Sequence, residues 1–189
     1  SLNGALIQMS YQFQNELSRI WEKAVLLYRS GNTNAVTFPI EEEMPSLVSL
    51  GINKIDVFDY AEDWCLHHEP DLLTFVLVHY ERWSYFLEEQ DGKTSTERID
   101  QYNMPPGSEK VEGIEWLPRI LPKARAKLKG ELPEEVMYGC GGDRHFFQNN
   151  NIHPAEFLRI TRKYIKDDHS IIQWVLERKN SAKLPLPNE

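Results

Sequence analysis

The stretch LPRILPKARAKLKGELPEEVMYGCGGDRHFF, residues 117–147, joins a basic amphipathic segment to a loop that holds the only Gly-Gly pair of the chain. Its leucines and alanines recur at helical spacing, which predicts a helix over residues 114–129. Pro118 falls in the first helical turn, where its missing N–H is harmless, whereas Pro122 is expected to kink the helix or delay its start. The stretch therefore predicts one helix and a loop that needs a separate explanation.

The loop itself is YGCGGDR, residues 138–144. Its three glycines permit positive φ angles and a close approach of other groups to the backbone. Asp143 is placed to cap a helix that begins near Arg144. Exposed N–H groups beside Arg144 would suit a small anionic ligand, although a tight turn that needs glycine only for its geometry explains the same residues. The spacing matches neither nucleotide-binding glycine motif, so no cofactor is expected.

The composition is that of a globular protein with enough apolar residues for one core or two small ones, at 189 residues and 41% hydrophobic content. The longest nearly apolar run, residues 72–80, is too short to span a bilayer, and the N-terminus lacks a secretory signal pattern. We therefore expect a cytoplasmic protein without membrane association. Cys65 and Cys140 are far apart and fit free thiols in a reducing compartment.

The charge is unevenly distributed along the chain, whose net charge is −8. Residues 11–90 carry 5 basic and 14 acidic side chains, whereas residues 111–181 carry 12 basic and 10 acidic ones. A basic second half could receive the phosphates of a nucleic acid, bind an acidic protein partner, or pair with the acidic first half. The basic faces could also simply be exposed to solvent. We favour a solvated face or pairing with the first half over the two ligand-binding interpretations, and nucleic-acid binding is unlikely by this measure. The basic residues lie in two predicted helices: Arg119, Lys123, Arg125, Lys127 and Lys129, then Arg159, Arg162, Lys163 and Lys166.

Four helices are predicted in the first half, over residues 10–29, 41–50, 53–67 and 70–87. Asn53 fits an N-cap with Asp56 as its capping-box partner, and Pro70 fits the first turn of the last and most apolar helix. That helix is the expected centre of the fold. Residues 91–113 are polar and rich in turn residues, and they read as a linker or a strap across the surface.

The second half repeats this pattern at an offset of 100 residues. LSRIWEKA at 17–24 shares five of eight residues with LPRILPKA at 117–124, and His153 with Glu156 stands where Asn53 and Asp56 stand in the first half. We therefore predict an all-α protein of two related four-helix units in tandem, residues 11–90 and 114–181. The alternatives are that amphipathic helices simply look alike and that both units form one compact domain. At most a minimal two-stranded element is expected, in which residues 35–38 pair with 136–138.

The same stretch resembles the signature of an uncharacterised bacterial family, a domain of unknown function, in which L-P-R-x-x-x-K-A-R-A-x-L-x-G precedes Y-x-C-x-x-D-R-x-F. The matching positions here are Leu117, Pro118, Arg119, Lys123, Ala124, Arg125, Ala126, Leu128, Gly130, Tyr138, Cys140, Asp143, Arg144 and Phe146. The resemblance is closest over residues 113–157, and longer members are also similar around residues 60–65. The family brings no activity, cofactor or catalytic residue, so the resemblance implies a shared fold unit and leaves function open.

From these features we expect a binding or interaction module that uses the loop and the basic helix faces. Its candidate ligand-binding residues are Tyr138, Cys140, Gly141, Gly142, Asp143, Arg144, Arg119, Lys123 and Arg125. A small enzyme is the alternative, acting on a small anionic substrate through Cys140, with His145 as a nearby base, or through Asp143 and Arg144. Nucleic-acid binding by the second half is a third hypothesis.

Asp63, His67 and His68 have spacing that could bind a metal, but a polar turn between two helices explains them better. The tryptophans are expected to pack in the core.

Overall fold

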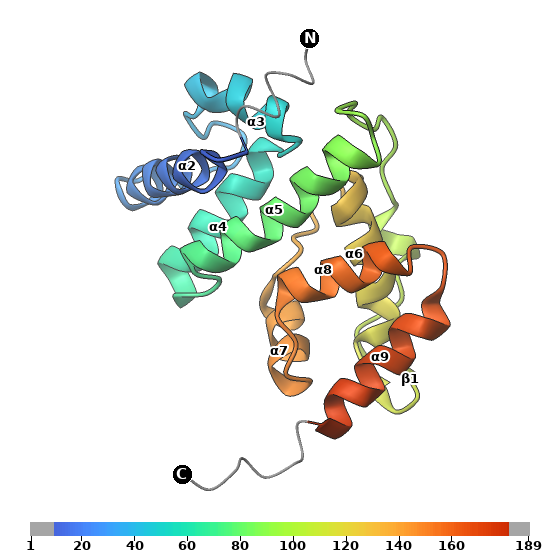
Figure 1. Cartoon of the computed structure of the whole chain (residues 1–189). Coiled ribbons are helices and arrows are strands. Elements are labelled where there is room, and N and C mark those ends of the chain that lie inside the picture. Colours follow the sequence, from blue (N-terminus) through green and yellow to red (C-terminus); the bar gives the residue numbers. More distant parts are fainter. Residues whose placement is uncertain (1–9, 182–189) are drawn as a thin grey trace, which may run out of the picture.

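The computed structural model describes residues 10–181, and helices dominate this range (Figure 1). The first half contains α2 (Phe13–Arg29), α3 (Met44–Leu50), α4 (Lys54–His67) and α5 (Leu72–Glu88). The second half contains α6 (Leu117–Lys129), α7 (Gly141–Asn149), α8 (Pro154–Lys163) and α9 (Asp168–Ser181). Two short 3₁₀ helices, η1 (Glu41–Glu43) and η2 (Gln101–Asn103), complete the helical elements of the described range. The prediction of an all-α fold is confirmed.

The minimal two-stranded element also exists, but the predicted strands were wrong. Residues 35–38 and 136–138 form turns and irregular backbone, whereas β1 (Lys110–Val111) pairs antiparallel with β2 (Ile114–Glu115). Glu112 and Gly113 join these strands, both with positive φ. Two such residues match the right-handed twist of a hairpin, and this local turn outweighs the β-branched pattern used for the prediction.

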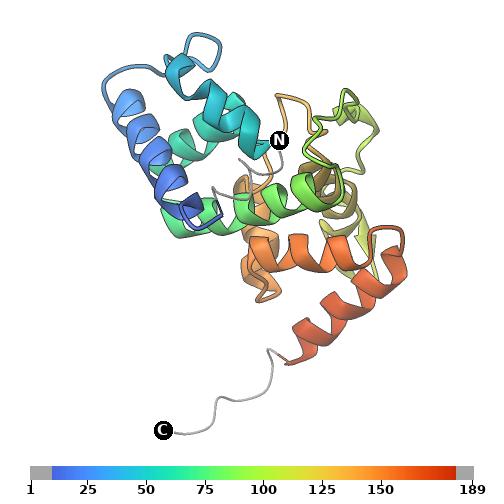
Figure 2. The ribbon, with the colours of Figure 1, turned by 45° about the horizontal axis from the view of Figure 1, so that its top comes forward.

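Helix α5 is the centre of the fold, as its apolar sequence predicts. It contacts α2 of the first half and both α6 and α8 of the second half. Figures 1 and 2 show it lying between these two groups of helices, while α9 projects from the edge of the molecule. Because the buried apolar residues of both halves form one continuous cluster, the halves share a core.

The helix caps explain where several elements begin. The capping box of Asn53 and Asp56 is confirmed at the start of α4. The predicted role of Pro70 was wrong, because α5 begins only at Leu72 and Asp71 caps it by accepting a hydrogen bond from the Thr74 amide. The Asp71 carboxylate accepts a hydrogen bond from a free N–H of the first helical turn. The proline side chain has no acceptor and cannot provide such a cap.

Helix α6 runs through Pro122 and begins at Leu117, so the expected delay of its start was wrong. Proline at the sixth position removes one backbone hydrogen bond. Against this loss, Leu117, Ile120 and Leu121 are all buried in the core by the same turns of helix. The burial of these side chains therefore outweighs the missing bond. The helix ends at Gly130, which adopts the left-handed conformation.

A buried polar network joins α4, α5 and α6. The Lys127 ammonium lies 2.9 Å from Asp56 Oδ1 and 3.0 Å from His79 Nε2. The ammonium has only protons to offer, so His79 Nε2 accepts and Nδ1 donates to the Phe75 carbonyl oxygen 2.7 Å away. Burial, and after it the Lys127 charge, lowers the pKa of His79 to about 3. His79 is therefore a neutral, buried connector between the halves.

Each half contains four α-helices in the described range. The third helix of each half, α4 and α8, begins at Lys54 and at Pro154, which are 100 residues apart. The predicted cap at His153 is present, since its Nδ1 accepts from the Ala155 amide. Glu156 instead forms an ion pair with Arg178. An internal duplication stays a prediction on these observations.

Residues 91–113 cross the surface between the halves. Ser95 and Ile99 hydrogen-bond to Glu131, and the Pro105 carbonyl accepts from Arg119. The segment is thus tied to the end and the start of α6. None of the helices that the structure describes is both long and apolar enough to cross a lipid bilayer.

Candidate functional site

Asp143 is fully buried and organises the glycine loop. Its carboxylate accepts from Trp116 Nε1 at 2.8 Å and from the Gly139 amide at 2.9 Å, and it lies 2.6 Å from Lys123 Nζ. The prediction that Asp143 caps a helix beginning near Arg144 was wrong, because α7 begins at Gly141 and Cys140 holds the cap position. A buried ammonium needs a carboxylate partner, so Asp143 compensates Lys123 and not the helix terminus.

Tyr138 fixes the loop to both halves of the molecule. Its hydroxyl donates to the Pro154 carbonyl oxygen at 2.7 Å, and its own carbonyl oxygen accepts from the Tyr60 hydroxyl at 2.6 Å. Both tyrosines are buried, and burial raises their pKa values well above the ordinary range. Tyr138 is therefore a structural anchor that a ligand cannot reach.

The three loop glycines differ in what the fold requires of them. Gly139 has a φ of +99°, and a Cβ there would lie 2.8 Å from the Tyr60 hydroxyl. A Cβ on Gly142 would lie 2.3 Å from the Trp116 ring. Gly141 has neither constraint, since the only neighbour of its hypothetical Cβ is Arg144 Nη2 at an ordinary 3.8 Å. Two glycines are thus explained by packing and the third is not.

Gly141 lines a cleft of about 600 Å³ between the two halves, which we name the Cys140 cleft. One wall is α4, with Asp59, Glu62 and Asp63, and the other is α6, with Arg119 and Lys123. Further polar lining comes from His67, from Gln101, from Glu134 and Glu135 in the segment before the loop, and from Cys140 and Arg144. The cleft thus has an acidic wall facing a basic one.

The acidic wall holds a carboxyl group with an unusual titration. Asp59 makes no hydrogen bond or ion pair within residues 10–181, and burial, followed by the charges of Asp56 and Glu62, raises its pKa to about 7. A strongly shifted carboxyl in a cleft is a common mark of a functional site. Opposite it, Arg119 forms no ion pair with the described residues and lies over the Trp116 ring.

Cys140 lies in this cleft beside Lys123, whose Nζ is 3.2 Å from its Sγ. The thiol also stands at the N-terminus of α7, where the helix dipole favours negative charge. Both cysteines are free and partly exposed. His145, the predicted base, is exposed and bonded to Asn149 four residues along α7, and it lines a different surface hollow beside Trp116.

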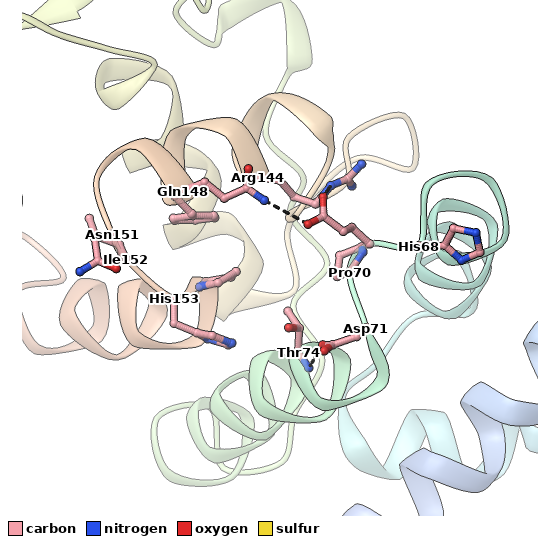
Figure 3. Close-up of a pocket in the computed structure, with 12 residues that line it drawn as sticks. His68, Pro70, Asp71, Thr74, Arg144, Gln148, Asn151, Ile152 and His153 are labelled. Carbon is pink, nitrogen blue, oxygen red and sulfur yellow. Dashed lines mark hydrogen bonds and ion pairs between the residues drawn. The ribbon is translucent and has the colours of Figure 1, made fainter. Parts of the chain in front are cut away.

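Arg144 separates the Cys140 cleft from a second one. Its Nη1 contacts Asp63 Oδ2 at 2.6 Å and the Gly139 carbonyl oxygen at 2.9 Å, and its Nε lies 3.6 Å from Glu69. On the Glu69 side lies another cleft of about 600 Å³, the His153 cleft, shown in Figure 3. Arg144 is thus engaged by residues of the chain itself on both sides.

Most of the predicted basic faces are also paired internally. Lys123 and Lys127 are buried against Asp143 and Asp56, Arg125 pairs with Asp168, and Arg162 contacts Glu88 and Glu89. Lys127 and Arg162 thus pair with the acidic first half, as one interpretation of the charge pattern expects, whereas Lys123 and Arg125 pair within the second half itself. Of the predicted ligand-binding residues, the cleft collects Arg119, Lys123, Cys140, Gly141 and Arg144, while Tyr138, Gly142, Asp143 and Arg125 lie outside its lining.

The weak metal candidates are divided among other roles. Asp63 is bonded to Arg144, His67 lines the Cys140 cleft, and His68 closes α4 in the left-handed conformation and lines the His153 cleft (Figure 3). No group of three or more His, Cys, Asp or Glu side chains in residues 10–181 has an arrangement that could hold a metal ion.

Comparison with known proteins now adds one finding. Residues 105–185 match a family model described as a domain of unknown function (DUF5069). The matched domain begins before β1 and includes α6, α7 and α8, so it carries the loop, Lys123 and the basic wall of the cleft. The acidic wall on α4 lies outside it. The match fits the resemblance to an uncharacterised domain family. A search of curated proteins and a search of solved structures each find no match.

Sequence reasoning missed Asp59, Glu62 and Trp116 as parts of this region. In the sequence, Asp59 and Glu62 look like ordinary polar residues on the solvent-facing side of an amphipathic helix. They lie in the same cleft as Arg119 only because α4 packs against the second half in the folded chain. Trp116 could have been noticed because it lies directly before the basic segment. An aromatic residue at such a position is, however, usually taken to pack in the core.

Proposed function

We propose that this protein is a binding module whose ligand is a small polar molecule held in the Cys140 cleft. The observation that carries the proposal is Gly141, a glycine that neither its φ angle nor its neighbours require and that leaves the cleft open. Gly141 is the exposed first residue of α7, where the geometry does not call for glycine, so we attribute its presence to the space it leaves for a ligand.

The charges of the cleft favour a ligand with a positive and a negative group. Asp59, Glu134 and Glu135 on one side have no partner among the described residues, and Arg119 on the other side has no ion pair. An amine can replace the proton that Asp59 holds near neutral pH, and a carboxylate or phosphate can pair with Arg119. A purely anionic ligand would meet the acidic wall without compensation.

The test is an NMR titration with three four-carbon probes: 4-aminobutyrate, butylamine and butyrate. We expect 4-aminobutyrate to bind most tightly and to shift the amide signals of residues 140–144. In Gly141→Leu, a side chain fills the cleft and binding weakens by about tenfold or more, a loss of about 1.4 kcal/mol. Gly141→Ala is the matched control, since it changes the same backbone position but adds only one carbon. Unchanged binding by Gly141→Leu, or no binding of any probe to the wild-type protein, would refute the proposal.

Thiol chemistry at Cys140 is the second candidate, favoured by the open cleft beside the thiol and by the Lys123 contact. We expect iodoacetamide to alkylate Cys140 faster than Cys65, whose pKa is raised by burial. Equal rates at the two cysteines near neutral pH would remove this candidate.

A further inference from the structure

The His153 cleft lies where four helix ends meet, on the other side of Arg144 from the Cys140 cleft. The ends of α4 and α7 supply Glu69 and Gln148, and the starts of α5 and α8 supply Asp71, Thr74 and His153. Pro70, Phe147, Ile152 and Pro154 contribute apolar surface. An apolar lining with a few converging polar groups is the usual composition of a small-molecule site.

His153 presents a hydrogen-bond donor to this cleft. Its Nδ1 accepts from the Ala155 amide at 3.0 Å, so the neutral ring must carry its proton on Nε2. His153 is an exposed residue, but partial burial of its ring lowers its pKa against the opposing charges of Asp71 and Glu156, so the neutral form prevails near neutral pH. Nε2 has no partner within residues 10–181, and Figure 3 shows the side chain directed across the cleft toward the start of α5.

The capping role does not explain why this residue is histidine. Asparagine, aspartate, serine and threonine are the preferred N-caps, and Asn53 fills the corresponding position of α4. At α8 the chain uses a weaker capping residue, whose side chain accepts one hydrogen bond at Nδ1 from a described residue. The imidazole of His153 has an N–H that reaches into the cleft. The shorter side chains of the usual N-cap residues have no such group.

The charged groups around the cleft are already compensated. Glu69 accepts from Gln148 at 3.1 Å and pairs with Arg144, which also binds Asp63. Asp71 accepts from the Thr74 amide at the positive end of α5. Because Glu69 and Asp71 already accept hydrogen bonds within the chain and the His153 imidazole is neutral, the cleft favours an uncharged ligand over an ion. This distinguishes it from the Cys140 cleft, where several carboxylates are unpaired.

We propose that the His153 cleft is a second binding site, for an uncharged molecule that places a carbonyl or hydroxyl oxygen against His153 Nε2–H and an apolar body against Phe147, Ile152 and the two prolines. The site is independent of the Cys140 cleft, because Arg144 stands between them and the two sets of lining residues otherwise differ.

Three matched aromatic probes test this assignment by NMR titration: benzamide, benzoate and benzylamine. Benzamide is expected to bind, to shift the imidazole signals of His153 and the side-chain amide signals of Gln148 and Asn151, and to leave residues 140–142 unchanged. The two charged probes are expected to bind at least about threefold more weakly, since each loses its hydration without gaining an ion pair.

His153→Asn is the decisive variant, because asparagine keeps the cap at α8 but is too short to present Nε2–H. It should keep the thermal stability of the wild-type protein and bind benzamide about three- to tenfold more weakly. Benzamide binding that is equally tight in His153→Asn would overturn the assignment, as would equal binding of the charged probes. Absence of benzamide binding to the wild-type protein would also overturn it, whatever the result at the Cys140 cleft.

Discussion

At the scale of single residues, some side chains in and near the loop are required by the fold, and others are not. Asp143 compensates the buried Lys123, and Tyr138 is bonded at both its hydroxyl and its carbonyl oxygen. Gly141 and His153 are different, because a better residue for local structure exists at each position. Local choices that disagree with the fold are expected at functional sites, and these two line separate clefts.

The contrast between adjacent glycines gives the first prediction. Gly142→Ala forces a methyl group into the Trp116 ring and should destabilise the protein by about 1–3 kcal/mol. Gly141→Ala meets no obstacle and should be neutral or stabilise by up to about 1 kcal/mol. Urea denaturation of the two variants measures the difference. If Gly141→Ala lost as much stability as Gly142→Ala, Gly141 would be structural and the argument for an open cleft would fail.

At the scale of elements, α5 and α6 carry the contact between the halves through charged groups as well as apolar ones. Lys127 of α6 joins Asp56 of α4 to His79 of α5 in the interior. Removing one partner of such a network leaves a buried charge without compensation, which usually costs 3–5 kcal/mol, an order-of-magnitude value. The network therefore fixes the register of α6 against the first half.

His79 makes this contact sensitive to acid. Its pKa is about 3 in the folded protein and near 6.5 when the chain unfolds. Between these values only the unfolded chain takes up the proton, so the stability is complete above pH 6.5 and falls as the pH is lowered toward 3. In His79→Gln, which can still accept from Lys127, the slope of the unfolding free energy against pH should decrease, by at most about 1.4 kcal/mol per pH unit.

Denaturant titrations of the wild-type protein and His79→Gln at several pH values check this prediction. All other titrating groups are common to the two proteins, so the difference between their slopes reports on His79 alone. Parallel slopes from pH 6.5 to 4 would show that His79 is protonated in the folded state.

At the scale of the whole molecule, the sequence predicted the helices well because each is encoded locally. Apolar spacing, the Asn53 capping box and the terminal glycines are read within a few residues. Some failures are local, such as the strand pairing and the start of α5, and the others come from tertiary contact. Pro122 is tolerated because its neighbours are buried, and Asp143 faces Lys123 instead of a helix end. The acidic wall of the cleft could not be predicted, since α4 meets the matched domain only in the folded chain.

The whole fold therefore creates the candidate site: neither half alone provides both walls of the Cys140 cleft. Asp59 on α4 is the residue whose behaviour depends most on this assembly, since burial and neighbouring carboxylates hold its pKa near 7. A ligand amine placed against Asp59 must displace its proton, so binding and titration are linked.

The most direct measurement is the pKa of the Asp59 carboxyl, followed by carbon-detected NMR with and without saturating 4-aminobutyrate. We expect a pKa of about 7 in the free protein and a clear decrease toward the ordinary aspartate range when the probe is bound. An ordinary pKa in the free protein, or a pKa that the bound probe leaves unchanged, would contradict the claim that the Cys140 cleft binds a positively charged group on its α4 wall.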